Sequence, residues 1–281
     1  MYSREFNQLE IPIVKTGPHI YVLNLDRHKA RLENMRHQLE ILGLAWERIA
    51  AVDAQQASEE ELKEYTDATG PIPRMGAGAR ACTVGHFKIW KTFLETDAPV
   101  AFILEDDVRI SERFSDFVEA APSYSNEVDI LNFNRQNSKR EQKKLVVSKI
   151  NPLIDSTFEG KQLLGPHYGT AGYMITRSTA ERLCHRIKRT NVPIDHLLFN
   201  PNVSTFNRSS RIYQAFPAIV EPDVEKFQTS IQKENIPTST HWWKKLARLY
   251  YETNRIPSML THYILGRAEI QILDFDASEN Y

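Results

Sequence analysis

Apolar and polar positions in the first fifty residues switch between strand-like runs and helix-like spacing. The run 19–25 is apolar and ends in polar residues, which predicts a buried strand. Leucine and methionine then recur every three or four residues from 32 to 42, and Gly43 supplies a helix stop signal. The segment 46–52 returns to an extended pattern. Strand, helix and strand over about 35 residues have the size of a βαβ unit, so this opening predicts an α/β fold.

Alternating elements are expected up to about residue 220. A capping box at 58–61 begins a short acidic helix, and another helix is predicted from about 79 to 95. The segment 99–104 is the most apolar of the chain and fits a central strand that is covered on both faces. Further strands are predicted at 128–133, 168–176 and 212–220, with helices at 111–121 and from 178 to 188.

The segment 135–149 interrupts this pattern. It carries six basic residues against one acidic residue and shows little apolar periodicity. Such a composition favours solvent over a packed core, so we expect a mobile basic surface loop here.

The C-terminal segment predicts an amphipathic helix. At 100° per residue, two tryptophans, two leucines and a tyrosine share one side and four basic residues fall opposite. The apolar set is Trp242, Trp243, Leu246, Leu249 and Tyr250, and the basic set is Lys244, Lys245, Arg248 and Arg255. Tandem tryptophan beside basic residues is typical of a membrane interface. A helix that packs its apolar face on the protein core would show the same pattern, so both interpretations stay open.

Composition restricts the function classes. The chain has 281 residues, 41% of them hydrophobic and 25% charged, as in an ordinary folded protein. Its 35 Lys and Arg against 36 Asp and Glu give a net charge of −1, which excludes a generally basic surface, and we expect no nucleic-acid partner. The cationic segments 135–149 and 241–270 must therefore sit on an otherwise acidic protein.

Sequence features also bear on the cellular compartment. No apolar stretch approaches the roughly 20 residues of a membrane-spanning helix, and the N-terminus lacks the apolar centre of a secretory signal. The two cysteines, Cys82 and Cys184, do not form a disulfide framework, which favours a reducing cytosol. We therefore expect a cytoplasmic protein.

Three consecutive acids, Glu105, Asp106 and Asp107, follow the most apolar strand. Ligands of open α/β sheets bind at the carboxyl ends of strands. Adjacent carboxylates repel one another, and a bound divalent cation would remove that penalty and present open positions to phosphate oxygens. A solvated acidic junction, or a cap of the next helix by Asp107, would explain the same residues.

A second polar strand end carries Asn24, Asp26, Arg27 and Arg31. These side chains could receive a nucleotide, with the amide or carboxylate on base or ribose and arginine on phosphate. The alternative is a helix capped by Asp26 with a solvated basic face.

Several short motifs in order give the chain a resemblance to a known family. They are Ile20-Tyr-Val-Leu-Asn-Leu-Asp-Arg27, Arg48-Ile-Ala-Ala-Val-Asp53, Ala81-Cys-Thr-Val-Gly-His86, Ile103-Leu-Glu-Asp-Asp-Val108, Tyr168-Gly-Thr-Ala-Gly-Tyr-Met-Ile175, Pro193-Ile-Asp195 and Ser230-Ile231. Together they cover roughly residues 18 to 232 and resemble glycosyltransferase family 25. One departure stands at Gly85, where the family usually has a serine before the motif histidine. His86 remains, and it fits a hydrogen-bonded helix histidine as well as a ligand.

The resemblance implies a GT-A-like, Rossmann-type nucleotide-sugar-binding domain with a C-terminal helical tail. By this resemblance Asn24, Asp26 and Asp53 would lie near the uridine of a UDP-sugar. Glu105, Asp106 and Asp107 would stand in for the acidic motif that holds Mn²⁺ or Mg²⁺.

The chemistry of sugar transfer suits these residues. Breaking the bond to the nucleoside diphosphate leaves negative charge on phosphate, which a divalent cation stabilises as a Lewis acid. We assign Asp107 and Glu105 as metal ligands, and Asn24, Asp26, Arg27, Arg31, Asp53 and Asp106 as donor-binding residues. Inverting transfer also needs a base for the acceptor hydroxyl, and Asp195 in its apolar surroundings is the candidate. Support of a loop is the alternative role of Asp195.

The resulting hypothesis has two regions. Residues 1–232 would form the catalytic domain, and residues 233–281 a basic amphipathic helical tail. The protein would be an inverting transferase that moves a hexose, galactose from UDP-galactose, to a glycolipid or oligosaccharide acceptor in lipooligosaccharide or lipopolysaccharide synthesis. Residues 241–270 would contact the anionic cytoplasmic face of the inner membrane. The alternatives are another UDP-sugar or acceptor, or a catalytically silent membrane-binding module.

Overall fold

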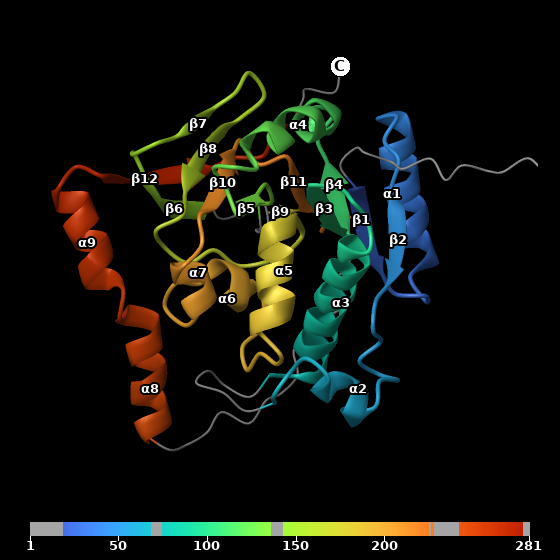
Figure 1. Cartoon of the computed structure of the whole chain (residues 1–281), viewed down its shortest axis with the longest axis horizontal. Helices are drawn as coiled ribbons and strands as arrows, with labels where there is room; N and C mark the ends of the chain where they lie inside the picture. Colours follow the sequence, from blue (N-terminus) through green and yellow to red (C-terminus); the bar gives the residue numbers. More distant parts are fainter. Residues whose placement is uncertain (1–18, 69–74, 136–142, 225, 228–241, 278–281) are drawn as a thin grey trace, which may run out of the picture.

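A mixed eight-stranded sheet forms the centre of the molecule (Figure 1). The computed structural model describes residues 19–68, 75–135, 143–224, 226–227 and 242–277. Across the sheet the strand order is β2 (Glu47–Ala50), β1 (His19–Asn24), β3 (Val100–Glu105), β9 (Gly172–Thr176), β5 (Ile130–Asn132), β10 (Ile212–Phe216), β8 (Glu159–Gln162) and β7 (Leu153–Ile154). The α/β prediction is confirmed.

Strand direction decides where polar side chains can meet. β1 pairs in parallel with both β2 and β3, so the carboxyl ends of these three strands share one edge. β9 runs antiparallel between β3 and β5, and β5 pairs in parallel with β10. The parallel group therefore presents the residues that follow Asn24, Ala50 and Glu105 at a single edge.

Helices cover both faces of the sheet. The helices of the main body are α1 (Lys29–Ile41), α2 (Glu59–Lys63), α3 (Ala77–Leu94), α4 (Phe114–Ala120), α5 (Arg177–Arg186), α6 (Ile194–Phe199) and α7 (Thr205–Arg208), with a 3₁₀ turn at Ala121–Tyr124. One core cluster includes Phe87 and Trp90 of α3, and the other includes Met35 of α1 and Phe117 of α4.

β3 is covered on both faces, as its continuous apolar run predicts. Ala101 and Ile103 pack in one core cluster, whereas Phe102 and Leu104 pack in the other, and all four are fully buried. Alternation of side chains along a strand sends successive residues to opposite faces. Because both faces are apolar, polar chemistry on this strand is confined to its end at Glu105.

The segment 135–149 is not a loop throughout, so that prediction is wrong for its second half. β6 (Lys143–Ser148) pairs antiparallel with β12 (Ala268–Leu273) near the C-terminus. Leu145 and Val147 are buried, and this two-residue alternation is a strand signal that the basic residues beside it obscured. Residues 136–142 lie outside the described residues.

The C-terminal region combines two helices with a strand. α8 (Trp242–Thr253) and α9 (Ile256–Ile264) confirm helical structure, and β12 then returns the chain to the main body. Asp276 accepts a hydrogen bond from Ser111 at 2.6 Å, and β11 (Val220–Pro222) pairs with β4 (Val108–Ile110) nearby. Within the described residues no helix is long and apolar enough to cross a membrane.

Candidate active site

A cavity of about 220 Å³ opens at the carboxyl edge of β1, β2 and β3. Its walls come from the turn into α1, the segment after β2, the start of α3 and the acids after β3. The lining includes Arg27, His28, Arg31, Ala51, Val52, Gln55, Ala77, Gly78, Cys82, Glu105, Asp106 and Asp107. The start of an α-helix favours a negatively charged group, so the α3 end and the arginines together suit a phosphate.

A buried hydrogen-bond network joins the end of β1 to the end of β3. Asn24 Nδ2 donates to Asp106 Oδ2 at 2.7 Å, and Arg31 Nη1 donates to Asp106 Oδ1 at 3.0 Å. The same Arg31 nitrogen lies 3.0 Å from Asp107 Oδ2. Asp106 is therefore held on both oxygens, which makes it an organiser of the site, and the structure brings these four predicted residues together.

The other predicted donor-binding residues lie nearer the surface. Arg27 forms an ion pair with Asp53, which joins the turn before α1 to the segment after β2. Asp26 is 82% exposed and pairs with Arg48. The expected cap of α1 by Asp26 is absent, since the residue before the helix is His28 and makes no side-chain cap.

Arg48 is a site residue that sequence reasoning passed over. Its Nε donates to Asn24 Oδ1 at 2.9 Å, so it orients the Asn24 amide whose nitrogen bonds Asp106. The parallel register of β1 and β2 makes this contact possible, because it pairs Asn24 with Ala50. The only sequence signal was the place of Arg48 in the motif that ends at Asp53.

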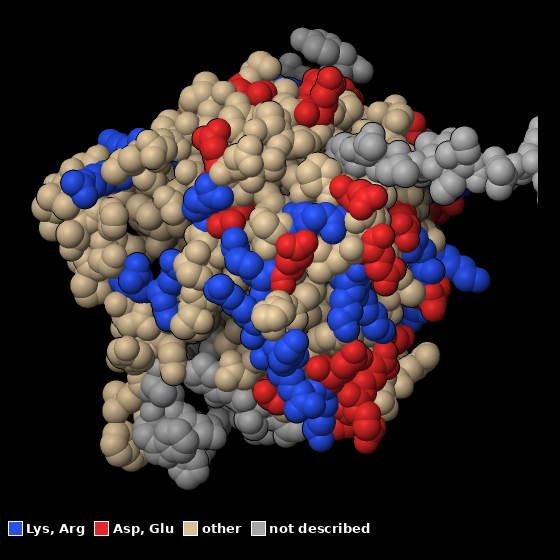
Figure 2. Space-filling model, viewed as in Figure 1, with Lys and Arg blue, Asp and Glu red and all other residues tan. Residues whose placement is uncertain are grey.

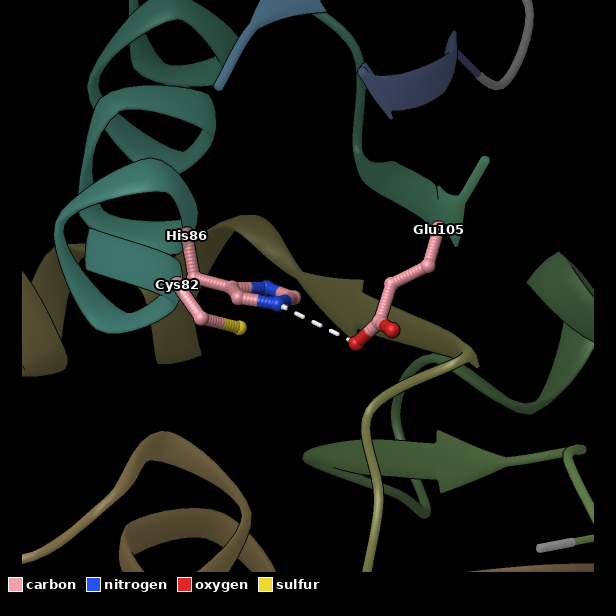
Figure 3. Close-up of side chains that lie close together, drawn as sticks. All are labelled: Cys82, His86 and Glu105. Carbon is pink, nitrogen blue, oxygen red and sulfur yellow. Dashed lines mark ion pairs between the residues drawn. The ribbon is translucent and has the colours of Figure 1, made fainter. Parts of the chain in front are cut away.

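Glu105 contacts a different group of residues from those that Asp106 and Asp107 contact. Its Oε1 accepts a hydrogen bond from Thr170 Oγ1 at 2.6 Å and lies 3.9 Å from His86 Nε2. Figure 3 shows Cys82 and His86 extending from α3 toward this carboxylate. The oxygen and nitrogen are too far apart for a hydrogen bond, and they form an ion pair only when the His86 ring is protonated.

Two of the acids, Asp107 and Glu105, have pKa values shifted in opposite directions, because their neighbours differ. Burial, together with the charge of Glu105, raises the pKa of Asp107 to about 7. Burial alone would also raise the pKa of Glu105, but His86, Thr170 and Arg31 together hold it below its usual range. Burial raises the pKa of the Cys82 thiol well above its usual value, and Glu105 and Asp195 add to that effect.

The acidic residues fit a hard divalent cation. Carboxylate oxygens are the ligands that Mg²⁺ and Mn²⁺ prefer. Three acids lie in sequence, while a single nearby guanidinium, that of Arg31, contacts Asp106 and Asp107. Burial, and after it the negative charge of Glu105, raises the pKa of Asp107, and a bound cation would favour the ionised carboxylate.

Asp195 lies at the start of α6 and is joined to the site through the segment before β9. Its Oδ2 accepts the backbone N–H of Gly169 at 3.3 Å, and its Oδ1 accepts that of His196 at 2.8 Å. Thr170, next in sequence, is the residue that bonds Glu105. These contacts support a loop, as the alternative interpretation expected, and the charge of Asp195 also acts on the Cys82 thiol.

Two glycines of the motifs have packing roles. A Cβ at Gly172 would lie 2.6 Å from Phe133 Cε2, so the missing side chain makes room for the core. A Cβ at Gly85 would lie 3.0 Å from two methyl carbons of Leu23. Gly85, at which the family that the chain resembles usually has a serine, therefore faces the buried side chain of Leu23.

The sequence is similar to a family of known proteins. The family model described as glycosyltransferase family 25 (LPS biosynthesis protein) matches residues 17–198. A glycosyltransferase 25 family member of Aedes aegypti is 28% identical over 235 residues, which cover 76% of this chain and 37% of that protein.

Two other relatives carry more specific names. The lipooligosaccharide biosynthesis protein lic2B of Haemophilus influenzae is 23% identical over 235 residues, covering 75% of this chain and 79% of that protein. Procollagen galactosyltransferase 1-B of Xenopus laevis is 20% identical over 281 residues, covering 89% of this chain and 44% of that protein. The chain spans between 27% and 37% of the length of the insect relatives it matches.

Proposed function

The chain belongs to glycosyltransferase family 25, and on that premise we propose that it is an inverting, metal-dependent galactosyltransferase. The donor would be UDP-galactose and the acceptor a saccharide of lipooligosaccharide, lipopolysaccharide or a related surface glycan. The names of two relatives, a lipooligosaccharide biosynthesis protein and a procollagen galactosyltransferase, support this choice of sugar and acceptor.

One observation carries the proposal: the carboxylates after β3 line the same cavity as the arginines of the β1–α1 turn and the start of α3. A nucleoside diphosphate sugar needs cationic groups for its diphosphate and oxygen ligands for the accompanying metal ion. Arg27 and the α3 start serve the first need, and Glu105 and Asp107 serve the second. Because Asp106 bonds both Asn24 and Arg31, it fixes the relative position of these groups.

Each part of the chain then has a distinct task. Asp107 and Glu105 would hold a divalent cation, which when bound would supply Lewis-acid stabilisation of the leaving diphosphate. Arg31 limits the repulsion between the carboxylates. Asp195 accepts the proton of the acceptor hydroxyl as the new glycosidic bond forms, and its two backbone N–H contacts fix the orientation of its carboxylate.

A screen of donors tests the assignment. Purified protein is incubated with UDP-galactose, UDP-glucose or UDP-N-acetylglucosamine, with Mn²⁺, Mg²⁺ or EDTA, and released UDP is measured. We expect the fastest release with UDP-galactose and Mn²⁺, and loss of release in EDTA. Faster turnover of another UDP-sugar would assign that sugar as the donor in place of UDP-galactose. Turnover unaffected by EDTA would contradict the metal requirement. Lack of any UDP-sugar binding would favour the catalytically silent alternative.

We also propose that α8 and α9 hold the protein at an anionic membrane surface, on the cytoplasmic face where such acceptors are built. Large apolar side chains of both helices are exposed: Trp242, Leu246, Leu249, Tyr250, Ile256, Leu260, Tyr263 and Ile264. Figure 2 shows few acidic side chains on the side that carries α9 (Figure 1). Basic residues in the sequence of the same segment suit anionic headgroups.

Vesicle sedimentation tests this contact. We expect binding to vesicles with phosphatidylglycerol and weak binding to vesicles of phosphatidylcholine alone. Equal, negligible binding to both would rule out the membrane. Point substitutions on α8 are preferable to deletion of the region, because deletion would also remove β12 and the contact of Asp276 with Ser111.

A further inference from the structure

A second donor cluster lies beside the acidic residues and has a different chemical character. Cys82, His86 and Glu105 each offer one ligand atom, and the sulfur, nitrogen and oxygen lie within 4.8 Å of one another. Cys82 and His86 are four residues apart on α3 and so share one helix face, which is the spacing by which helices present paired metal ligands. Figure 3 shows both side chains directed at Glu105.

The imidazole of His86 supplies an independent observation. His86 is fully buried, and its Nε2 has no hydrogen-bond partner among the residues that the structure describes. Buried polar atoms are normally paired, because an unpaired one loses its hydration without compensation. The unpaired nitrogen points to the space between Cys82 and Glu105, where the nearest carboxylate oxygen is 3.9 Å away. This atom is therefore directed at a position that a ligand could fill.

The other ring nitrogen is held by a hydrogen-bond chain. Trp90 Nε1 donates to the hydroxyl oxygen of Tyr173 at 3.0 Å, and this hydroxyl is 2.9 Å from His86 Nδ1. A hydroxyl group can donate or accept, so Tyr173 supports either tautomer of the ring. When Nδ1 carries the proton and donates to Tyr173, the lone pair of Nε2 faces Cys82 and Glu105. Metal-binding histidines are commonly oriented by such a second contact.

We propose that Cys82, His86 and Glu105 form a site for a borderline-soft divalent cation, with Zn²⁺ as the typical occupant. Thiolate, imidazole and carboxylate together suit Zn²⁺ and not Mg²⁺ or Mn²⁺. With metal–ligand distances of about 2.0–2.3 Å, the three atoms need to close by roughly 1 Å around the ion, which side-chain rotation achieves. Binding releases the thiol proton of Cys82 to solvent and leaves one coordination position open.

The two sites share Glu105. If the proposed function holds, Zn²⁺ bound to Cys82 and His86 withdraws this carboxylate from the ion that serves the donor. The site would then act as an inhibitory one, sensitive to free Zn²⁺. Binding itself does not depend on the transferase assignment, so the two proposals can fail separately.

Cobalt substitution tests the site without any measurement of turnover. Co²⁺ replaces Zn²⁺ in such sites, and a cobalt–thiolate bond produces an ultraviolet charge-transfer band. We expect one bound Co²⁺ per chain to produce this band, and we expect the band to disappear when Zn²⁺ is added and displaces Co²⁺. Cys82→Ser should abolish the band and weaken Zn²⁺ binding at least tenfold, measured by competition with a chromophoric chelator. Cys184→Ser is the matched control, since Cys184 is outside the cluster, and it should keep the band.

A second measurement uses the unmodified protein, in case Cys82→Ser does not fold. The rate of alkylation of each cysteine is measured by mass spectrometry of peptides, with and without Zn²⁺. We expect Zn²⁺ to slow the alkylation of Cys82 at least tenfold and to leave Cys184 unchanged. A wild-type protein with no charge-transfer band, a band of equal strength in Cys82→Ser, or equal alkylation of Cys82 with and without Zn²⁺ would overturn the proposal.

Discussion

The carboxyl edge of the sheet buries charged side chains, whereas the C-terminal helices expose apolar ones. At the sheet edge, charged groups such as Asp106 and Arg31 are buried and paired with one another. On α8 and α9, large apolar groups such as Trp242 and Ile264 are 71% and 80% exposed. Both arrangements cost free energy in an isolated monomer, one by desolvation of charge and the other by hydration of apolar surface.

The two regions therefore suit partners of different kinds. In the proposed function, a cation offsets the negative charge beside Asp107, and an apolar membrane phase covers the exposed side chains of α8 and α9. Substitutions that remove one cost should affect only the region concerned.

The largest effect is expected for Asp107→Ala. Loss of a metal ligand at the leaving diphosphate should lower kcat for UDP-galactose by roughly 10²–10³-fold, because transition-state charge is then left unstabilised. Initial rates of UDP release at saturating Mn²⁺ check this. Asp97→Ala, an exposed acid in the turn after α3, is the control and should keep the wild-type rate. Full activity of the Asp107 variant would remove this residue from the metal site.

Asp195→Asn should lower kcat by roughly 10²-fold with little change in KM for the donor, because the amide cannot accept the proton of the acceptor. Steady-state rates as a function of acceptor concentration make the measurement. Thermal unfolding serves as the control for the contact with Gly169. A stable variant with an unchanged kcat would leave Asp195 as a loop support only.

On the C-terminal helices, the double substitution Trp242→Ser and Leu246→Ser should weaken binding to anionic vesicles at least tenfold. Each side chain contributes on the order of 1.5–3 kcal/mol when it moves from water into an apolar phase. Sedimentation with phosphatidylglycerol vesicles provides the measurement. Ile41→Ser is the matched control, since Ile41 is 69% exposed at the end of α1, and it should bind as the wild type does. Turnover of a soluble acceptor should be unchanged in the double variant.

The smallest effect is a gain in stability for Asp107→Asn. In the folded protein the pKa of Asp107 is about 7, above its ordinary value of 3.8, so unfolding releases a proton between these values. Wild-type stability therefore falls as pH rises from about 4 to 7, and the neutral amide avoids this loss. We expect the variant to be more stable by roughly 1–2 kcal/mol at pH 8, after allowance for the partial exposure of the side chain.

Urea denaturation without divalent cations at pH 8 and pH 4 checks the sign of this effect. The difference between Asp107→Asn and wild type should shrink toward zero at pH 4, where both side chains are neutral. A difference that stays constant between the two pH values would mean that folding does not raise the pKa of Asp107. Added Mn²⁺ should stabilise the wild type more than the variant, because the amide is a poorer ligand.

From the sequence alone, the order of elements from β1 to β3 and the position of the acids could be predicted, whereas β6 and β12 could not. Continuous apolar residues from Val100 to Leu104 require cover on both faces, so the polar residues had to follow at the strand end. The ordered motifs identified the family, and helical spacing marked α8. These inferences succeed because burial and periodicity are local properties that a linear pattern records.

Only the tertiary structure decided which polar groups meet. The bond of Arg48 to Asn24 depends on the parallel register of β1 and β2, and the pairing of β6 with β12 joins segments more than a hundred residues apart. The cluster of Cys82 and His86 with Glu105 likewise requires α3 to lie against the end of β3. Such contacts follow from the packing of whole elements, since spacing along the chain carries no record of distance across the fold.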